Sequence, residues 1–174
     1  EAAVGLQLKV HAPGLMPDAS IVIPAIPPLA TRKVAFPISI GAALPSDSVP
    51  LQITLRYVRE GRRGPHSRPD TVYDNASVTL RNRKPGDTYK RTFISDIDGS
   101  VQYYSVNPAH PLTKNPPPGA LFLSLHGAGV EAIGQADAYE SKTWGDLFAP
   151  TNRRPYGFDW EYWGRIAAMA VLGI

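Results

Sequence analysis

The residues best suited to chemistry lie in one short segment, Leu121–Val130, which reads LFLSLHGAGV. Its apolar start predicts a buried strand. Gly127 and Gly129 then allow the backbone to turn with exposed N–H groups and no Cβ beside them. Because preorganised N–H groups stabilise the oxyanion that develops during acyl transfer, the pattern indicates an oxyanion hole. The loop comprises His126, Gly127 and the two predicted donors, the amides of Ala128 and Gly129.

Other reactive side chains have simpler structural interpretations. Ser124 lies inside the expected strand with neither a sharp turn nor a neighbouring base, and His126 is expected to brace the loop by hydrogen bonding. The chain has no cysteine, which excludes a thiol nucleophile, a disulfide framework and cysteine-bound metal. His11, His66 and His110 have no companions at ligand spacing, so we expect neither a metal nor a cofactor.

The segments after this loop are expected to form a helix, a strand, a polar loop and a second helix. Residues 130–142 can form a helix, although Gly134 weakens it, and residues 144–150 read as an apolar strand bounded by Gly and Pro. Asp159 is a plausible N-cap for a helix that runs to Ile174 with apolar residues at helical spacing. These elements would hold the glycine loop at one edge of a sheet.

This order of elements, together with the HGAG motif, resembles the α/β-hydrolase superfamily on its prolyl-oligopeptidase and esterase side. The resemblance covers residues 121–172. In that family an HGGG-type loop follows the third strand and contributes to the oxyanion hole. The resemblance implies that residues 94–174 form the first half of a three-layer α/β/α hydrolase domain, with strand 101–106 opening its sheet. It also implies that the catalytic Ser, Asp and His lie beyond residue 174, in that chain order.

We expect the first part of the chain, residues 1–93, to form a β-sandwich accessory domain. Residues 6–12 and 49–58 alternate apolar and polar side chains with the period of a strand. Residues 19–26, 33–42, 76–82 and 87–95 are further candidates, separated by Pro, Gly, Asp and Asn. Strands at this spacing are typical of an all-β sandwich, which we expect to be immunoglobulin-like. Pro24 and Pro37 indicate edge strands or bulges.

Charge divides between the two parts. Residues 1–93 carry 13 Lys and Arg against 7 Asp and Glu, a net of +6, and residues 94–174 carry 5 against 8, a net of −3. The arginines are scattered and lack interleaved aromatic side chains, so we expect no nucleic-acid partner. No apolar run reaches the length of a membrane helix, so no membrane partner is expected. The 18 prolines, the lack of cysteine and the expected front module suit an exported bacterial enzyme, secreted or periplasmic.

The loop after the strand at 144–150 reads TNRRPYGFDWEYWGR over Thr151–Arg165 and has two interpretations of equal weight. In the first, Arg153 or Arg154 holds a substrate carboxylate through its planar guanidinium fork. In the second, an arginine, Asn152 and Asp159 tie the loop down. The first interpretation uses the aromatic side chains as walls of a substrate site, namely Tyr156, Phe158 and Trp160.

The leading functional hypothesis is the N-terminal portion of a serine hydrolase, a peptidase or a carboxylesterase, that acts on a peptide or ester through an acyl-enzyme. Its partner would be the remainder of the catalytic domain, supplied by a complementary chain or by the other product of a proteolytic cleavage. The alternative is a non-catalytic binding or scaffold protein whose β-sandwich is the functional part.

Overall fold

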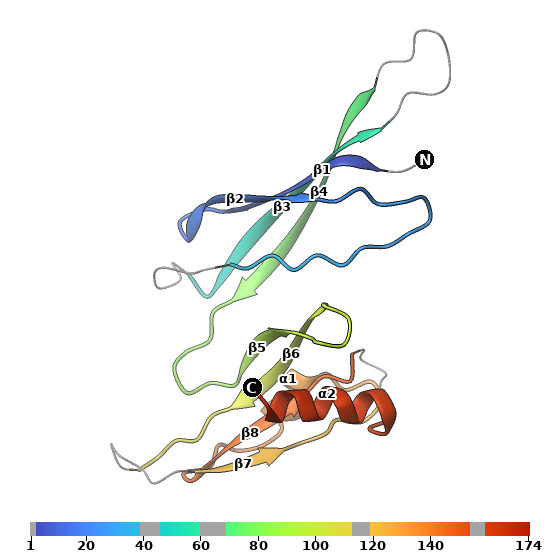
Figure 1. Cartoon of the computed structure of the whole chain (residues 1–174). Coiled ribbons are helices and arrows are strands. Elements are labelled where there is room, and N and C mark those ends of the chain that lie inside the picture. Colours follow the sequence, from blue (N-terminus) through green and yellow to red (C-terminus); the bar gives the residue numbers. More distant parts are fainter. Residues whose placement is uncertain (1–2, 39–45, 60–68, 113–118, 154–158) are drawn as a thin grey trace. The chain divides into compact units, whose positions relative to one another are not determined.

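The described residues form mostly β-sheet, with two four-stranded sheets and few helices (Figure 1). The computed structural model describes residues 3–38, 46–59, 69–112, 119–153 and 159–174. The chain divides into two compact units, Glu1–Asn82 and Arg83–Ile174. The β-sheet predicted for the first part of the chain is confirmed, and the assignment of the second part to an α/β-hydrolase domain stays a proposal.

The first unit is built on an antiparallel sheet with the strand order β2-β1-β3-β4. Its strands are β1 (Val4–Ala12), β2 (Met16–Ile23), β3 (Ser48–Arg59) and β4 (Asp70–Arg81). Alternation along β1 turns Leu6, Val10 and Ala12 inward and leaves the residues between them more exposed. A buried cluster of Ala12, Leu15, Val49 and Leu51 forms the core, and Ile38 packs against it from the segment that follows β2.

One candidate strand of this unit does not form where it was expected. Residues 33–38 are described and belong to no strand, while residues 39–42 lie outside the described residues. Pro37 explains part of the difference, since proline has no N–H to donate to a ladder. Within the described residues up to Asn82, the strands make a single sheet. The immunoglobulin-like sandwich topology therefore stays a proposal.

The boundary between the two units lies earlier than the predicted position after residue 93. Strand β5 (Tyr89–Ile94) was assigned to the first part of the chain, but it pairs antiparallel with β6 (Val101–Asn107) in the second unit, with Tyr89 opposite Val106. The turn that joins them contains Gly99, at a φ of 65°. This hairpin moves the boundary to residues 82 and 83.

The second sheet has the order β5-β6-β8-β7, so the last strand along the chain lies inside the sheet. Strand β7 (Ala120–Leu123) runs parallel to β8 (Gly145–Pro150), and β8 runs antiparallel to β6. Helix α1 (Ala132–Asp137) makes the crossover that parallel strands require. Strand β7 is consequently an edge strand, and its carboxyl end leads into the predicted oxyanion loop.

One helix packs on each face of this sheet. Helix α1 contributes to a cluster of Ala132, Ala136, Leu147 and Ala149. Helix α2 (Tyr162–Leu172) contributes Val171 to a second cluster with Tyr104 and Val106, against which Phe148 packs. Since neighbouring residues of a strand point to opposite faces, Leu147 and Phe148 of β8 place the two clusters on opposite sides. No described helix has both the length and the apolar character needed to cross a membrane.

Both helices are shorter than predicted. The Nδ2 atom of Asn107 in β6 donates to the carbonyl oxygens of Ala136 at 3.2 Å and of Tyr139 at 2.7 Å. These bonds satisfy carbonyl groups at and just after the end of α1 and hold the chain in a non-helical path there. The helix therefore ends at Asp137 instead of continuing to residue 142. The N-cap of α2 is Glu161 rather than Asp159, whose Oδ1 instead accepts a hydrogen bond from the Glu161 N–H at 2.8 Å.

Candidate functional site

The glycine loop begins directly at the carboxyl end of β7. The Ser124 N–H donates to the Phe148 carbonyl at 2.8 Å, which extends the pairing of β7 with β8 by one residue. The Gly127 carbonyl then accepts from the Val130 N–H at 3.2 Å and closes a four-residue turn. Gly129 is the third residue of this turn and has a φ of 76°, which glycine adopts without strain and other residues avoid.

The predicted oxyanion donors are exposed on this turn. Ala128 and Gly129 are both solvent-exposed, and their N–H groups donate to no acceptor in the described part of the chain. The turn thus presents successive backbone donors to solvent at the carboxyl end of a strand. Such donors can bind the oxygen of a polarised carbonyl or a tetrahedral oxyanion.

His126 braces the loop, as the sequence indicated. It is 3% exposed, and its Nδ1 donates to the Gly127 carbonyl at 2.9 Å. Its own backbone carbonyl accepts from Nε1 of Trp160 at 2.9 Å. The two rings meet edge to face, with centroids 5.1 Å apart and an interplanar angle of 78°. Both the side chain and the main chain of His126 are therefore engaged within the protein.

Ser124 has a structural role, as the sequence indicated, but it lies just after β7, and β7 is largely exposed rather than the buried strand that was predicted. Its Oγ accepts from Nε2 of Gln135 at 2.8 Å and donates to the Tyr139 hydroxyl at 3.2 Å. These bonds connect the end of β7 to the helix that follows the loop. The loop is consequently held at both of its ends.

A cavity of about 280 Å³ lies beside the loop, at the carboxyl ends of β7 and β8. Open α/β sheets bind their ligands at this edge. Part of the wall is apolar, with Val101, Tyr103 and Val130, and part is polar, with Glu131, Thr151 and Arg153. His126 also lines the cavity, so the cavity and the oxyanion loop share a wall.

The surroundings of the cavity change the pKa of the Tyr103 phenol. Burial raises the pKa of its phenol above the ordinary value of 10.0, and the negative charge of Glu131 raises it further. The phenol is therefore protonated at neutral pH. The ammonium of Lys90 lies 4.4 Å from the centroid of the Tyr103 ring and 3.9 Å from the Glu131 carboxylate. The Lys90–Glu131 pair is half exposed, so we expect it to contribute little to stability.

Arg153 is a bracing residue in this structure, but its partner differs from the predicted Asp159. Its Nη1 lies 2.9 Å from Oδ2 of Asp98, and its Nη2 donates to Oγ of Ser95 at 2.6 Å. Arg153 also has a positive φ of 56°. Its guanidinium is thus already paired with the β5–β6 turn, which lies more than fifty residues earlier in the chain.

The rest of the loop is tied down at its two ends. Nδ2 of Asn152 donates to the Asp159 carbonyl at 2.6 Å, as the bracing interpretation predicted. Gly164 of α2 approaches so closely that a Cβ there would lie 2.3 Å from the same carbonyl oxygen. Trp160 meets His126 rather than an open site. The other candidate substrate residues, Arg154, Tyr156 and Phe158, lie outside the described residues.

Sequence reasoning missed several residues that line the cavity. Tyr103, Glu131 and Thr151 line it, and Asp98 fixes Arg153. In the sequence, Asp98-Gly99 has only the signature of a tight turn. Pairing strand 101–106 with strand 144–150 in an antiparallel sheet would have brought this turn beside Arg153, but nothing local in the sequence specifies that pairing.

No set of His, Cys, Asp or Glu side chains within the described ranges is arranged to hold a metal ion. Comparison with known proteins gives no match to a family model, a curated protein or a solved structure. The functional interpretation therefore stands on the geometry of this site.

Proposed function

We propose that this chain is the N-terminal portion of a serine hydrolase of the α/β-hydrolase type, a peptidase or a carboxylesterase. The observation that carries the proposal is the exposed turn after β7, in which the amides of Ala128 and Gly129 are unengaged within the described residues. Two hydrogen bonds hold the same turn: the buried His126 ring donates to the Gly127 carbonyl, and the Trp160 indole donates to the His126 carbonyl. Unengaged backbone donors on an exposed turn near a cavity suit the stabilisation of an oxyanion during acyl transfer.

The arrangement of the second unit supports this class. The turn follows the third strand of its sheet along the chain, as the HGGG-type loop does in the superfamily. The strands on either side of the crossover are parallel, and one helix covers each face of the sheet. The β-rich first unit would be the accessory domain, with an immunoglobulin-like topology, and we propose that the enzyme is exported.

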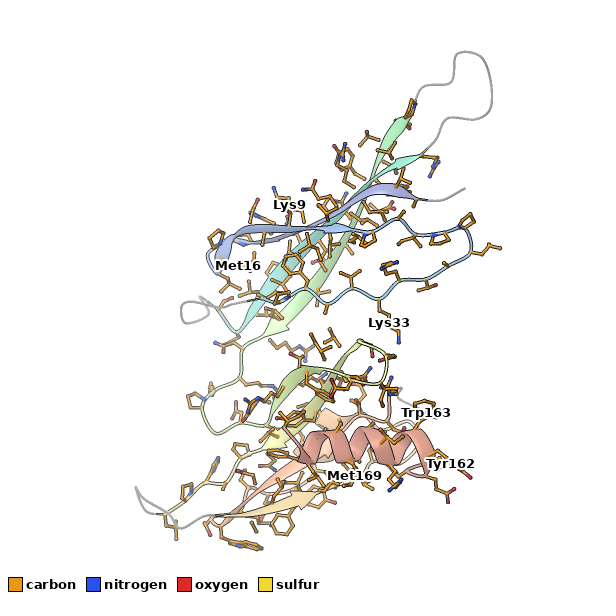
Figure 2. All side chains as sticks on the ribbon, viewed as in Figure 1. Lys9, Met16, Lys33, Tyr162, Trp163 and Met169 are labelled. Carbon is orange, nitrogen blue, oxygen red and sulfur yellow. The ribbon has the colours of Figure 1, made fainter. Side chains whose placement is uncertain are left out.

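The exposed apolar surface of the second unit supports the proposed partner, the remainder of the catalytic domain. The outer edge of β7 pairs with no described strand, although Leu121 and Phe122 make this strand apolar. Helix α2 buries its small residues against the sheet and exposes its large ones (Figure 2), which are Tyr162, Trp163, Ile166, Met169 and Leu172. An unpaired edge and an uncovered apolar helix face favour covering by further protein.

In the proposed mechanism a serine beyond residue 174 attacks the substrate carbonyl, activated by a histidine that an aspartate orients. The carbonyl oxygen becomes an oxyanion and accepts hydrogen bonds from the amides of Ala128 and Gly129. Collapse of the tetrahedral intermediate expels the amine or alcohol and leaves an acyl-enzyme, which water then hydrolyses. The cavity beside the loop would hold a substrate group next to the reacting carbonyl.

The test is substitution of Gly129 by Val in the complete protein that contains this chain. A β-branched side chain disfavours the φ of 76°, so the turn should lose its geometry, and kcat should fall by about 10²–10³, the usual effect of losing one oxyanion donor. Gly134→Ala is the matched control, because a Cβ at that helical position meets nothing within 4 Å. A Gly129→Val variant that folds and retains the wild-type kcat would refute the assignment of the oxyanion loop.

A further inference from the structure

The indole of Trp160 connects the two loops at the carboxyl edge of the second sheet. Its Nε1–H donates to the His126 carbonyl at 2.9 Å, across 34 residues of sequence. Its ring also contacts the buried His126 ring edge to face. Trp160 is therefore joined to the first residue of the oxyanion loop through both a hydrogen bond and ring packing.

This hydrogen bond acts on the part of the loop that has the greatest conformational freedom. The His126 carbonyl belongs to the peptide group that joins His126 to Gly127, so its orientation fixes the direction of the Gly127 N–H. It thereby limits the placement of the next peptide group, which carries the Ala128 N–H and whose Gly127 carbonyl accepts from the His126 ring and the Val130 N–H. Two of the three residues after His126 are glycines, which lose more backbone freedom on ordering than other residues. A fixed carbonyl at the start of the loop reduces the number of orientations that the following amides can adopt.

Trp160 is itself held by the segment around it. The Asp159 carbonyl immediately before it accepts from Asn152 at 2.6 Å, and the Asp159 carboxylate accepts from the Glu161 N–H at 2.8 Å. Gly164 allows α2 to begin in direct contact with this pair. The indole is thus anchored to the end of β8 and the start of α2 rather than to a free loop.

From these contacts we infer that Trp160 is the positioning residue of the oxyanion loop: it fixes the His126 carbonyl and thereby the direction of the Ala128 and Gly129 amides. Its effect on catalysis rests on the proposed hydrolase function, whereas its effect on the loop conformation does not. This role differs from that of a substrate-site wall, which the sequence indicated for Trp160.

The test begins with Trp160→Phe in the full chain, because phenylalanine keeps an aromatic ring beside His126 and removes the donor. Trp163→Phe is the matched control, since Trp163 is 62% exposed and three residues away. In heteronuclear NMR spectra the Trp160 indole N–H should exchange most slowly of the three tryptophans. Trp160→Phe should shift the Gly127, Ala128 and Gly129 amide resonances, and Trp163→Phe should leave them in place. Equal effects of the two substitutions would overturn the inference.

Kinetics of the complete protein provide the second measurement. Trp160→Phe should lower kcat roughly tenfold, the upper range expected for one hydrogen bond, with KM changed little. Its affinity for a boronate that mimics the tetrahedral intermediate should fall by the same factor. Shifted amides in a protein without hydrolase activity would support the loop contact and refute the proposed function. An active Trp160→Phe variant with wild-type kcat and boronate affinity would refute the positioning role alone.

Discussion

Substitution of Gly164 by Ala probes the packing that anchors the Trp160 segment. A Cβ at Gly164 would lie 2.3 Å from the Asp159 carbonyl oxygen and 2.8 Å from Nδ2 of Asn152. Both distances are below van der Waals contact, and the nearer atom belongs to the backbone. Because the added methyl group meets both partners of the 2.6 Å hydrogen bond between Asn152 and Asp159, it should displace the start of α2 and break that bond as well.

The expected loss of stability follows from three contributions. Overpacking a close contact costs about 1–3 kcal/mol. Loss of the Asn152–Asp159 hydrogen bond adds about 0.5–1.5 kcal/mol. The higher helix propensity of alanine stabilises the helix by about 1 kcal/mol relative to glycine, which offsets part of this loss. We therefore expect Gly164→Ala to lower the free energy of unfolding of the second unit by about 2 kcal/mol.

Urea denaturation followed by tryptophan fluorescence measures this effect in the relevant unit, because Trp144, Trp160 and Trp163 all lie in it. Gly134→Ala in α1 is the control, since its Cβ meets nothing within 4 Å and should stabilise the unit by about 0.5–1 kcal/mol. The two Gly→Ala substitutions should thus have opposite signs. Stabilisation by Gly164→Ala would refute the close packing of α2 on Asn152 and Asp159.

Two further predictions concern the cavity wall. Subtracting the ultraviolet pH titration of a Tyr103→Phe variant from that of the wild type should give a curve centred above pH 10.0. A midpoint at or below that value would contradict the partial burial of the Tyr103 phenol beside Glu131. Because the folded-state pKa is raised, the stability contributed by the protonated phenol should be complete below pH 10 and decline as the pH rises further. A double-mutant cycle of Arg153→Gln with Asp98→Asn should give a coupling of about 0.5–3 kcal/mol. The same cycle with Asp159→Asn in place of Asp98→Asn should give a coupling energy near zero. A larger coupling of Arg153 with Asp159 than with Asp98 would refute the observed bracing.

Much of the local structure was predictable because it depends on local patterns. The period-two alternation of residues 6–12 and 49–58 predicted β1 and β3, and the apolar runs before and after the glycine loop predicted β7 and β8. The turn itself follows from glycine chemistry, and Gly129 has the positive φ that only glycine adopts easily.

The remaining features depend on partners distant in sequence, which local patterns do not specify. Strand β5 was assigned to the first part of the chain because its own sequence does not show which sheet its hairpin with β6 joins; that depends on the pairing of β6 with the distant β8. Helix α1 was predicted too long because its end depends on Asn107 of β6. Likewise, Arg153 pairs with Asp98 across 55 residues, although the nearby Asp159 was the obvious candidate.

Labelling with a fluorophosphonate probe tests the proposed serine hydrolase most directly. The complete protein should bind one probe molecule per chain at a serine outside residues 1–174, as peptide mapping by mass spectrometry would show, and the 174-residue chain alone should remain unlabelled. Stoichiometric labelling of a serine within this chain, such as Ser124, would contradict the account. A folded complete protein that takes up no probe would contradict it equally and would favour a non-catalytic binding protein.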